Sequence, residues 1–162
     1  MRGSFERKIS GRFVQRVFAQ AEAPVADALL QAGLDVRSPG DEVPIEHFVG
    51  GLQLFSKRRF PALPAGEAMR RVGYELVSKQ PGTLDERLSA LPEKLETIGA
   101  FFEPRVHSHG ERHFVAHFGD VASLHTFFLG LLEGVTSSTN EKVQVSWQPE
   151  GLSGARYDLR VA

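Results

Sequence analysis

Residues 113–135 read HFVAHFGDVASLHTFFLGLLEGV, and the spacing of apolar side chains changes partway along this stretch. At its start, His113, Val115 and His117 alternate with phenylalanine and alanine, which is the two-residue period of a β-strand. From Val121 to Val135 the apolar residues instead recur every three or four positions, as they do in a helix. We therefore predict a strand with phenylalanines on one face and histidines on the other, followed by a broadly apolar helix.

The patterns on either side extend this unit in both directions. Two further strands are predicted after the helix, at 143–147 and 157–161, and one before it, at 101–106, joined through a turn at 108–111. Upstream, helical spacing predicts helices at 5–18, 24–33, 44–55, 65–78 and 92–100. The predicted fold class is α+β, with N-terminal helices packed on a small antiparallel sheet of β-β-α-β-β order. We expect a single domain over 1–162, mainly helical over 1–98 and β-β-α-β-β over 99–162.

Composition excludes several classes of protein. The 162 residues hold 19 Lys and Arg against 20 Asp and Glu, a net charge of −1, which argues against a nucleic-acid-coating surface. The absence of cysteine excludes disulfides, a thiolate nucleophile and a cysteine-ligated zinc. With neither a membrane-spanning nor a secretory segment recognisable, we expect a cytoplasmic protein.

Two resemblances add to this interpretation. Gly33-Leu34-Asp35, Phe60-Pro61, Glu67-Ala68 and the Arg70-to-Gly73 helix resemble the shared motifs of a bacterial family of unknown function restricted to the Myxococcales. From Leu88 onward, the chain is also similar to the sheet half of the haem–NO-binding, vinyl-reductase-like and TRAPP-like superfamily. That resemblance implies helices placed before a β-β-α-β-β unit, and a role as a ligand sensor or trafficking subunit.

The departures from the haem-binding branch bear directly on the cofactor. That branch resembles this region through a histidine on the helix before the sheet and a Tyr-x-Ser-x-Arg clasp. Here the corresponding helix, Leu88–Ile98, has no histidine, and residues 117–121 read HFGDV, with neither Tyr nor Arg. Iron would lack an axial ligand of that kind, so we predict no haem and no other cofactor.

Five of the six histidines fall between His107 and His125, the most unusual local feature of the chain. His107, His109, His113 and His117 are weak candidates for a metal site, because imidazole is a common zinc ligand. His113 and His117, four apart on a strand, lie about 13 Å apart, so a single ion would need the turn histidines as well. The alternatives are joint protonation near pH 6–6.5 and a solvated strand face.

Other side chains are candidates for binding. An apolar ligand between helices and sheet would be lined by Phe101, Phe114, Phe118 and Trp147. Basic side chains suit contact with a partner, as does the extra apolar face that Leu129 adds to the long helix. The basic candidates are Lys57, Arg58, Arg59, Arg70, Arg71, Arg156 and Arg160.

No catalytic motif emerges: the chain has no G-x-S-x-G, G-x-G-x-x-G, P-loop or H-E-x-x-H pattern, and no catalytic residue is assigned. We therefore predict a non-enzymatic regulatory or adaptor domain that acts through a protein partner or a homodimer, with no nucleic acid and no membrane span. The alternative is a sensor of a small apolar ligand held between helices and sheet. A weaker alternative is a metal-dependent enzyme that uses the histidine cluster.

Overall fold

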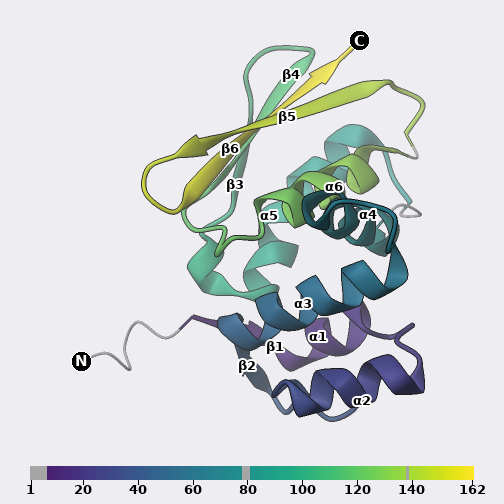
Figure 1. Ribbon diagram of the computed structural model, residues 1–162. Coiled ribbons are helices and arrows are strands. Elements are labelled where there is room, and N and C mark those ends of the chain that lie inside the picture. The colour runs from purple at the N-terminus through teal and green to yellow at the C-terminus, as the bar shows by residue number, and fades with distance from the viewer. Residues whose placement is uncertain (1–6, 78–80, 138) are drawn as a thin grey trace.

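A four-stranded antiparallel sheet stands over a layer of helices in the computed structural model, which describes residues 7–77, 81–137 and 139–162 (Figure 1). The predicted α+β class and the β-β-α-β-β order are confirmed. The sheet contains β3 (Arg105–Ser108), β4 (His113–Phe118), β5 (Val143–Glu150) and β6 (Gly154–Val161), in the order β3-β4-β6-β5, and α6 (His125–Ser137) lies between β4 and β5 in the chain.

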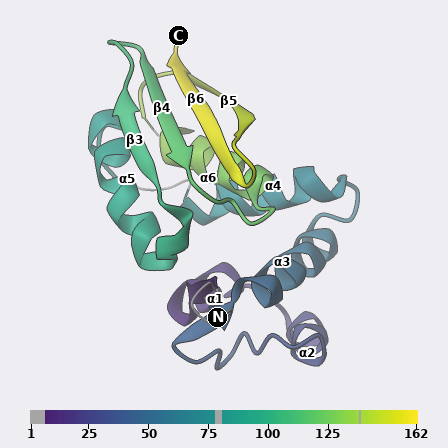
Figure 2. The same ribbon diagram turned by 90° about the vertical axis from the view of Figure 1, so that its left-hand side faces the viewer.

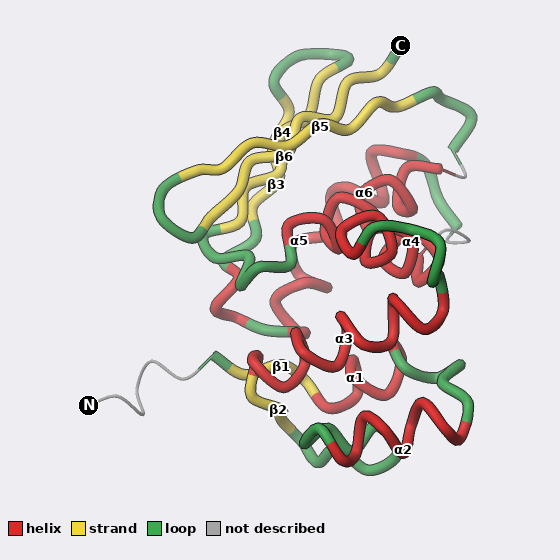
Figure 3. The backbone as a smooth tube through the Cα atoms, in the orientation of Figure 1, coloured by secondary structure: helices red, strands yellow, loops and turns green. Residues whose placement is uncertain are grey.

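The first part of the chain forms one short ribbon and a series of helices, of which the last two lie beside α6 and the sheet (Figure 3). Strands β1 (Lys8–Ser10) and β2 (Glu42–Pro44) pair antiparallel to form the ribbon. The remaining elements are α1 (Gly11–Val17), α2 (Ala23–Gln31), α3 (Ile45–Arg59), α4 (Ala65–Val77), α5 (Leu84–Ile98) and a 3-10 turn, η2 (Ala100–Phe102). None of the helices within the described part of the chain is both long and apolar enough to cross a bilayer.

The sheet has two chemically different faces, as the alternation predicts. Ala116 and Phe118 of β4 are buried against the helices, and Phe114 packs beside them. His113 and His117 lie on the opposite face, where they pair across the sheet with Arg160 and Arg156 of β6. In Figure 2 this face is the side of the sheet away from α6.

Helix α6 is buried on nearly all sides. Its aromatic residues pack in two directions, because Phe128 stacks on Phe118 of the sheet at 4.5 Å while Phe127 meets the N-terminal helices. The rings of Phe127, Phe13 of α1 and Phe48 of α3 lie 5.8–6.3 Å apart in mostly edge-on or tilted contacts. The apolar breadth of this helix therefore reflects its position between the sheet and the other helices.

Glycines allow α4 and α6 to cross backbone against backbone. A Cβ atom added at Gly130 would lie 1.8 Å from the carbonyl oxygen of Arg70, and one added at Gly73 would lie 2.3 Å from that of Phe127. Arg70 also forms hydrogen bonds of 2.7 and 2.5 Å with the carboxylate of Glu133 across this crossing. Those hydrogen bonds raise the pKa of the Arg70 guanidinium, which stays charged.

The predicted helix at 5–18 is wrong at its start. Residues 8–10 instead form β1, whose register sets Ile9 opposite Val43, and the helix begins at Gly11. Ile9 and Val43 are both buried, so the non-local pairing with β2 overrides the helical spacing. Phe5 and Ser78, which are predicted ends of helices, lie outside the described residues.

Helix α5 begins at Leu84, eight residues before the predicted start at 92. Thr83 caps it in a reciprocal capping box with Glu86, a Thr-x-x-Glu signal that is readable in the sequence. Pro92 therefore lies inside the helix, where proline costs roughly 3 kcal/mol. Burial of four leucines along α5 offsets that cost; they are Leu84, Leu88, Leu91 and Leu95.

The strand predicted at 101–106 is only partly correct. Residues 100–102 form the turn η2, in which Phe102 is fully buried and rests edge-on against Phe128 at 4.9 Å. Glu103 then adopts a left-handed conformation (φ 47°), and β3 follows from Arg105. Because Phe102 is buried in the core, the strand begins four residues later in the sequence than predicted.

We expect Gly130→Ala to destabilise the protein by about 3 kcal/mol, because its methyl group would force the α4 and α6 backbones apart. The matched control is Gly50→Ala on α3, where an added Cβ meets no atom within 4 Å and should add about 0.5–1 kcal/mol of stability. Urea unfolding followed by circular dichroism measures both. Equal stability of Gly130→Ala and the unmodified chain would contradict the backbone crossing.

Candidate functional site

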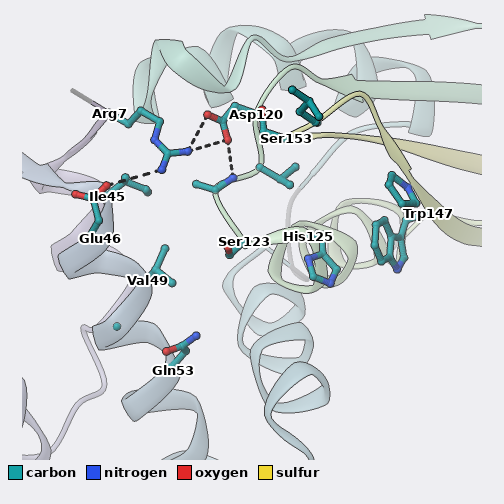
Figure 4. A pocket seen from close by; sticks show the side chains of 16 residues that line it. Arg7, Ile45, Glu46, Val49, Gln53, Asp120, Ser123, His125, Trp147 and Ser153 are labelled. Atoms are coloured by element: carbon teal, nitrogen blue, oxygen red, sulfur yellow. Dashed lines mark hydrogen bonds and ion pairs between the residues drawn. The ribbon is translucent and has the colours of Figure 1, made fainter. Parts of the chain in front are cut away.

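A groove of about 560 Å³ lies where α3 faces the β4–α6 loop and the β5–β6 hairpin (Figure 4). Helix α3 contributes Ile45, Glu46, Val49 and Gln53 along one wall. The opposite wall is formed by Arg7 and by segments far away in the sequence: Asp120, Val121, Ala122, Ser123, His125, Trp147, Pro149, Leu152 and Ser153. This size falls within the range of small-molecule sites.

An ion pair closes one end of the groove. Nη1 of Arg7 donates hydrogen bonds of 2.9 and 3.1 Å to the two carboxylate oxygens of Asp120, 113 residues away. A carboxylate oxygen of Glu46 lies 3.8 Å from Nη2 of Arg7. The backbone carbonyl of Arg7 also accepts a hydrogen bond from Ile45 N–H at 2.8 Å. Arg7 therefore joins the N-terminal ribbon, α3 and the loop after β4.

The β4–α6 loop lines the groove because it does not continue as helix. The helix predicted from Val121, with Asp120 as its N-cap, is wrong by four residues. Asp120 instead accepts the N–H of Ala122 at 2.8 Å in a tight turn, and Ala122 and Ser123 take left-handed conformations (φ 49° and 67°). Such conformations cost of order 1 kcal/mol each in non-glycine residues and tend to occur at binding sites.

Trp147 and His125 form the aromatic end of the groove. Their ring centroids are 4.4 Å apart, and Trp147 remains 36% exposed, which is high for an indole. Burial lowers the pKa of His125, so its imidazole is neutral at pH 7. The backbone carbonyl of His125 accepts a 2.7 Å hydrogen bond from the Tyr157 hydroxyl, whose pKa is raised by burial. The His125–Trp147 ring pair is therefore uncharged, and the hydrogen bond from Tyr157 fixes the backbone of His125.

The groove combines apolar and polar surface. Val49 and Trp147 offer apolar surface, whereas Gln53 and Ser123 offer hydrogen bonds (Figure 4). Among the described lining residues, no hydrogen bond joins Ser123 or Ser153 to the His125 ring. The arrangement suits binding of a small, partly apolar molecule by stacking and a few hydrogen bonds.

Of the four aromatic residues predicted to line a ligand pocket, only Trp147 lines this groove. Phe118 is 2% exposed and stacks on α6, and Phe114 packs against the core. Phe101 lies behind the ion pair, with the Arg7 guanidinium 5.9 Å from its ring centre. The non-local Arg7–Asp120 pair and the left-handed turn carry no sequence signal, which is why sequence reasoning missed them.

The predicted histidine candidates come together on the outer face of the sheet. Ring centroids are 5.0 Å apart for His107 and His117, 5.3 Å for His107 and His109, and 5.4 Å for His109 and His113. Within the described residues, however, no three His, Asp or Glu side chains converge as a metal site would require. Ring nitrogens of His113 and His117 meet carboxylates instead, at 2.6 Å from Asp158 and 2.7 Å from Glu150.

Most of the basic candidates for partner contact have partners within the chain. Lys57 Nζ donates to the carbonyls of Pro61 and Leu63, Arg59 pairs with Glu75, and Arg70 pairs with Glu133. The Arg71 guanidinium lies 5.7 Å from the Phe60 ring centre, and Arg58 is exposed.

The other candidates lie on two different surfaces. Leu129 is only 8% exposed, which leaves little of it for a second subunit. Arg156 donates to Asp158 within the outer sheet face, and Arg160 stands beside it, exposed.

The fold itself has solved counterparts. The structure superposes on a mutant H-NOX domain of T. tengcongensis with a TM-score of 0.66, 17% identity and coverage of 99% of this chain and 97% of that one. An H-NOX protein from S. oneidensis in an Fe(II) state gives a TM-score of 0.68, 14% identity and 95% and 96% coverage. An oxygen-binding H-NOX domain related to soluble guanylate cyclases gives a TM-score of 0.66, 16% identity and 93% and 90% coverage.

These similarities establish the haem–NO-binding (H-NOX) fold for this chain and confirm that part of the predicted resemblance. At this level of identity they establish the fold alone. No protein-family model matches the sequence, and no curated protein is significantly similar to it, so the Myxococcales-restricted family stays a prediction.

The residues present do not fit a haem. Helix α5 carries no histidine, and the space between the N-terminal helices and α6 is filled by the ring contacts of Phe13, Phe48 and Phe127. In the groove, the His125 ring packs against Trp147. The two carboxylates that line the groove, Glu46 and Asp120, stand beside one arginine, Arg7. Haem propionates need cations there, and Arg7 is already neutralised by Asp120.

We expect haemin added to the purified protein to give no stoichiometric shift of the Soret band, because α5 carries no histidine and the arginine at the groove, Arg7, is already paired with Asp120. Absorbance titration against buffer measures this. A saturable one-to-one Soret shift would contradict the expectation, and its loss in His125→Ala would place the haem in the groove.

We expect Asp120→Asn to destabilise the protein by about 1–2 kcal/mol at low salt, because it removes a half-buried ion pair while leaving an acceptor for Ala122 N–H. The deficit should shrink in 1 M NaCl. Asp27→Asn is the control: its pair with Arg37 is more than half exposed, so the change should cost below about 0.5 kcal/mol. Equal losses for the two variants in urea unfolding would contradict a special role for Asp120.

Proposed function

We propose that the chain is a sensor domain that binds a small, partly apolar molecule in the groove without haem, and that it works by binding and not by catalysis. The observation that carries this proposal is the groove itself, which is built jointly by α3, the strained β4–α6 loop and the β5–β6 hairpin and contains the exposed indole of Trp147. A ligand there would contact both the N-terminal helices and the sheet.

The structural neighbours support a sensor more than an adaptor. They are H-NOX domains, one of them an oxygen complex, so the fold is used elsewhere to hold a small ligand. An adaptor would depend on Leu129 and the basic residues, yet Leu129 is buried and Arg59 and Arg70 pair within the chain. The sensor alternative therefore replaces the adaptor as the favoured function.

The loop that lines the groove is also the element best placed to respond. It contains two left-handed non-glycine residues, and it is tied to the hairpin by a 2.8 Å hydrogen bond from Val121 N–H to the Ser153 carbonyl. A ligand that presses on Ala122 or Ser123 would act on a segment whose conformation is already costly. We infer that occupancy is transmitted from this loop to α6, which begins directly after it.

A fluorescent apolar probe tests the site. We expect N-phenyl-1-naphthylamine to bind with a dissociation constant of about 10–100 µM, in keeping with its size. Because Trp147 is the only tryptophan, bound probe should also quench its emission by energy transfer. Val49→Gln, which places an amide on the apolar wall, should weaken binding at least tenfold.

The control is Leu30→Gln on α2, an equally apolar-to-polar change at a half-exposed residue outside the groove, which should leave the affinity unchanged. Equal affinity of Val49→Gln and Leu30→Gln would place the probe elsewhere and contradict the proposal. Hydrogen exchange supplies the second readout: bound probe should slow the Ala122 and Leu124 amides, and unchanged exchange would contradict the sensing step.

A further inference from the structure

A second surface, separate from the groove, lies on the outer face of the sheet. We call it the imidazole face and define it by four histidines and the charged residues around them: His107, His109, His113, His117, Arg105, Arg156, Arg160, Asp158 and Glu150. In Figure 2 the sheet lies in front of α6, with this face turned away from the helices. Trp147 belongs to the opposite, helix-facing side, opposite Tyr157 in the register.

The histidines of this face form a continuous packed row. His117, His107, His109 and His113 follow one another at centroid separations of 5.0–5.4 Å. Val115, which lies among them and points away from the helices, is nonetheless fully buried. The imidazole rings therefore cover the Val115 side chain, and their contacts with one another define their positions.

Protonation would change the charge of this face strongly. With neutral imidazoles, three arginines stand against Asp158 and Glu150, a net charge of +1, and four charged imidazoles raise it to +5. The turn between β3 and β4 adds Glu111 and Arg112, which cancel. Both carboxylates are already engaged, Asp158 by His113 and Arg156 and Glu150 by His117.

The surroundings of His107 disfavour its charged form. Desolvation, followed by the proximity of His117, His109, Arg105 and Arg156, lowers the pKa of His107. Burial opposes ionisation of Asp158, but hydrogen bonds from Arg156 and His113 outweigh it and lower the pKa of this carboxyl group. An imidazole of ordinary pKa, about 6.5, gains a positive charge on acidification, so mildly acidic pH adds positive charge to this face.

We propose that the imidazole face is a docking surface for an acidic, extended protein segment at mildly acidic pH. Charge complementarity selects such a partner, since a bound carboxylate is most favourable when the imidazoles are charged. The spacing of these side chains also matches an extended partner. Arg105 and His107 lie on one face of the edge strand β3, about 6.6 Å apart along the strand. Acidic residues at alternate positions of an extended chain have the same spacing. Nucleic acid fits less well, because the face contains two carboxylates and no large aromatic ring for base stacking.

The test uses a fluorescein-labelled peptide of six Glu-Thr repeats, followed by fluorescence anisotropy at pH 5.5 and 7.5 in low salt. Its side chains remain mostly ionised at both values. We expect binding at least tenfold tighter at pH 5.5. The double variant His107→Gln/His109→Gln, at two exposed positions, should reduce this ratio below threefold, and the control His47→Gln, an exposed histidine on α3, should leave it intact.

Four results would overturn the proposal. The first is equal affinity for the peptide at the two pH values, and the second is an unchanged ratio of the two affinities in the double variant. The third is equally tight binding of a single-stranded oligothymidine of the same charge. The fourth is pH-dependent self-association of the chain alone in sedimentation. The third would point to general anion binding, and the fourth to a second copy of the chain as the occupant.

Discussion

Burial of α6 on nearly all sides is the constraint on which the rest of the structure depends. One side packs against Phe118 and Tyr157 of the sheet, another meets Phe13 and Phe48, and a third lies backbone to backbone with α4 at Gly130. A helix with so little exposed surface must be covered from several directions, so the sheet and the N-terminal helices are placed relative to one another through it.

The groove is a consequence of that arrangement. The chain leaves β4 at Phe118 and must turn sharply before it can enter α6, and Asp120 stabilises that turn while pairing with Arg7 from the far end of the sequence. The turn, α3 and the β5–β6 hairpin therefore meet where no single element could form a pocket. Haem is studied in a solved H-NOX structure of the same fold. Here phenylalanine rings fill the space between the helices, in keeping with the principle that function belongs to the site and not to the fold.

The sheet separates two kinds of chemistry. Its helix-facing side carries Trp147, whose ring lines the groove, and Tyr157, whose hydroxyl donates to the His125 carbonyl. Its outer side carries the imidazoles and arginines. Because strand side chains alternate strictly, the imidazoles and the groove residues lie on opposite sides of the sheet. The two surfaces can therefore be tested one at a time by substitution.

The sequence by itself determined the kinds of element and the faces they bury. Alternation over His113–Phe118 and the apolar breadth of 121–135 were enough to predict the strand, its two faces and the helix between sheet and helices. It also predicted the histidine cluster, because that depends on residue type and local period alone, while the lack of a histidine on the helix before the sheet mattered only through the resemblance to the haem-binding branch. The groove was largely invisible: Trp147 was predicted, but Arg7 and Asp120 were not.

Tertiary structure alone decided where elements begin and which distant residues meet. Lys8–Ser10 became a strand because Ile9 pairs with Val43, and α6 started late because Asp120 bonds to Ala122 and Arg7. The Ile9–Val43 and Arg7–Asp120 contacts join residues tens of positions apart, so no local spacing encodes them. Their free energy comes from burial and charge pairing that exist only once the chain has folded.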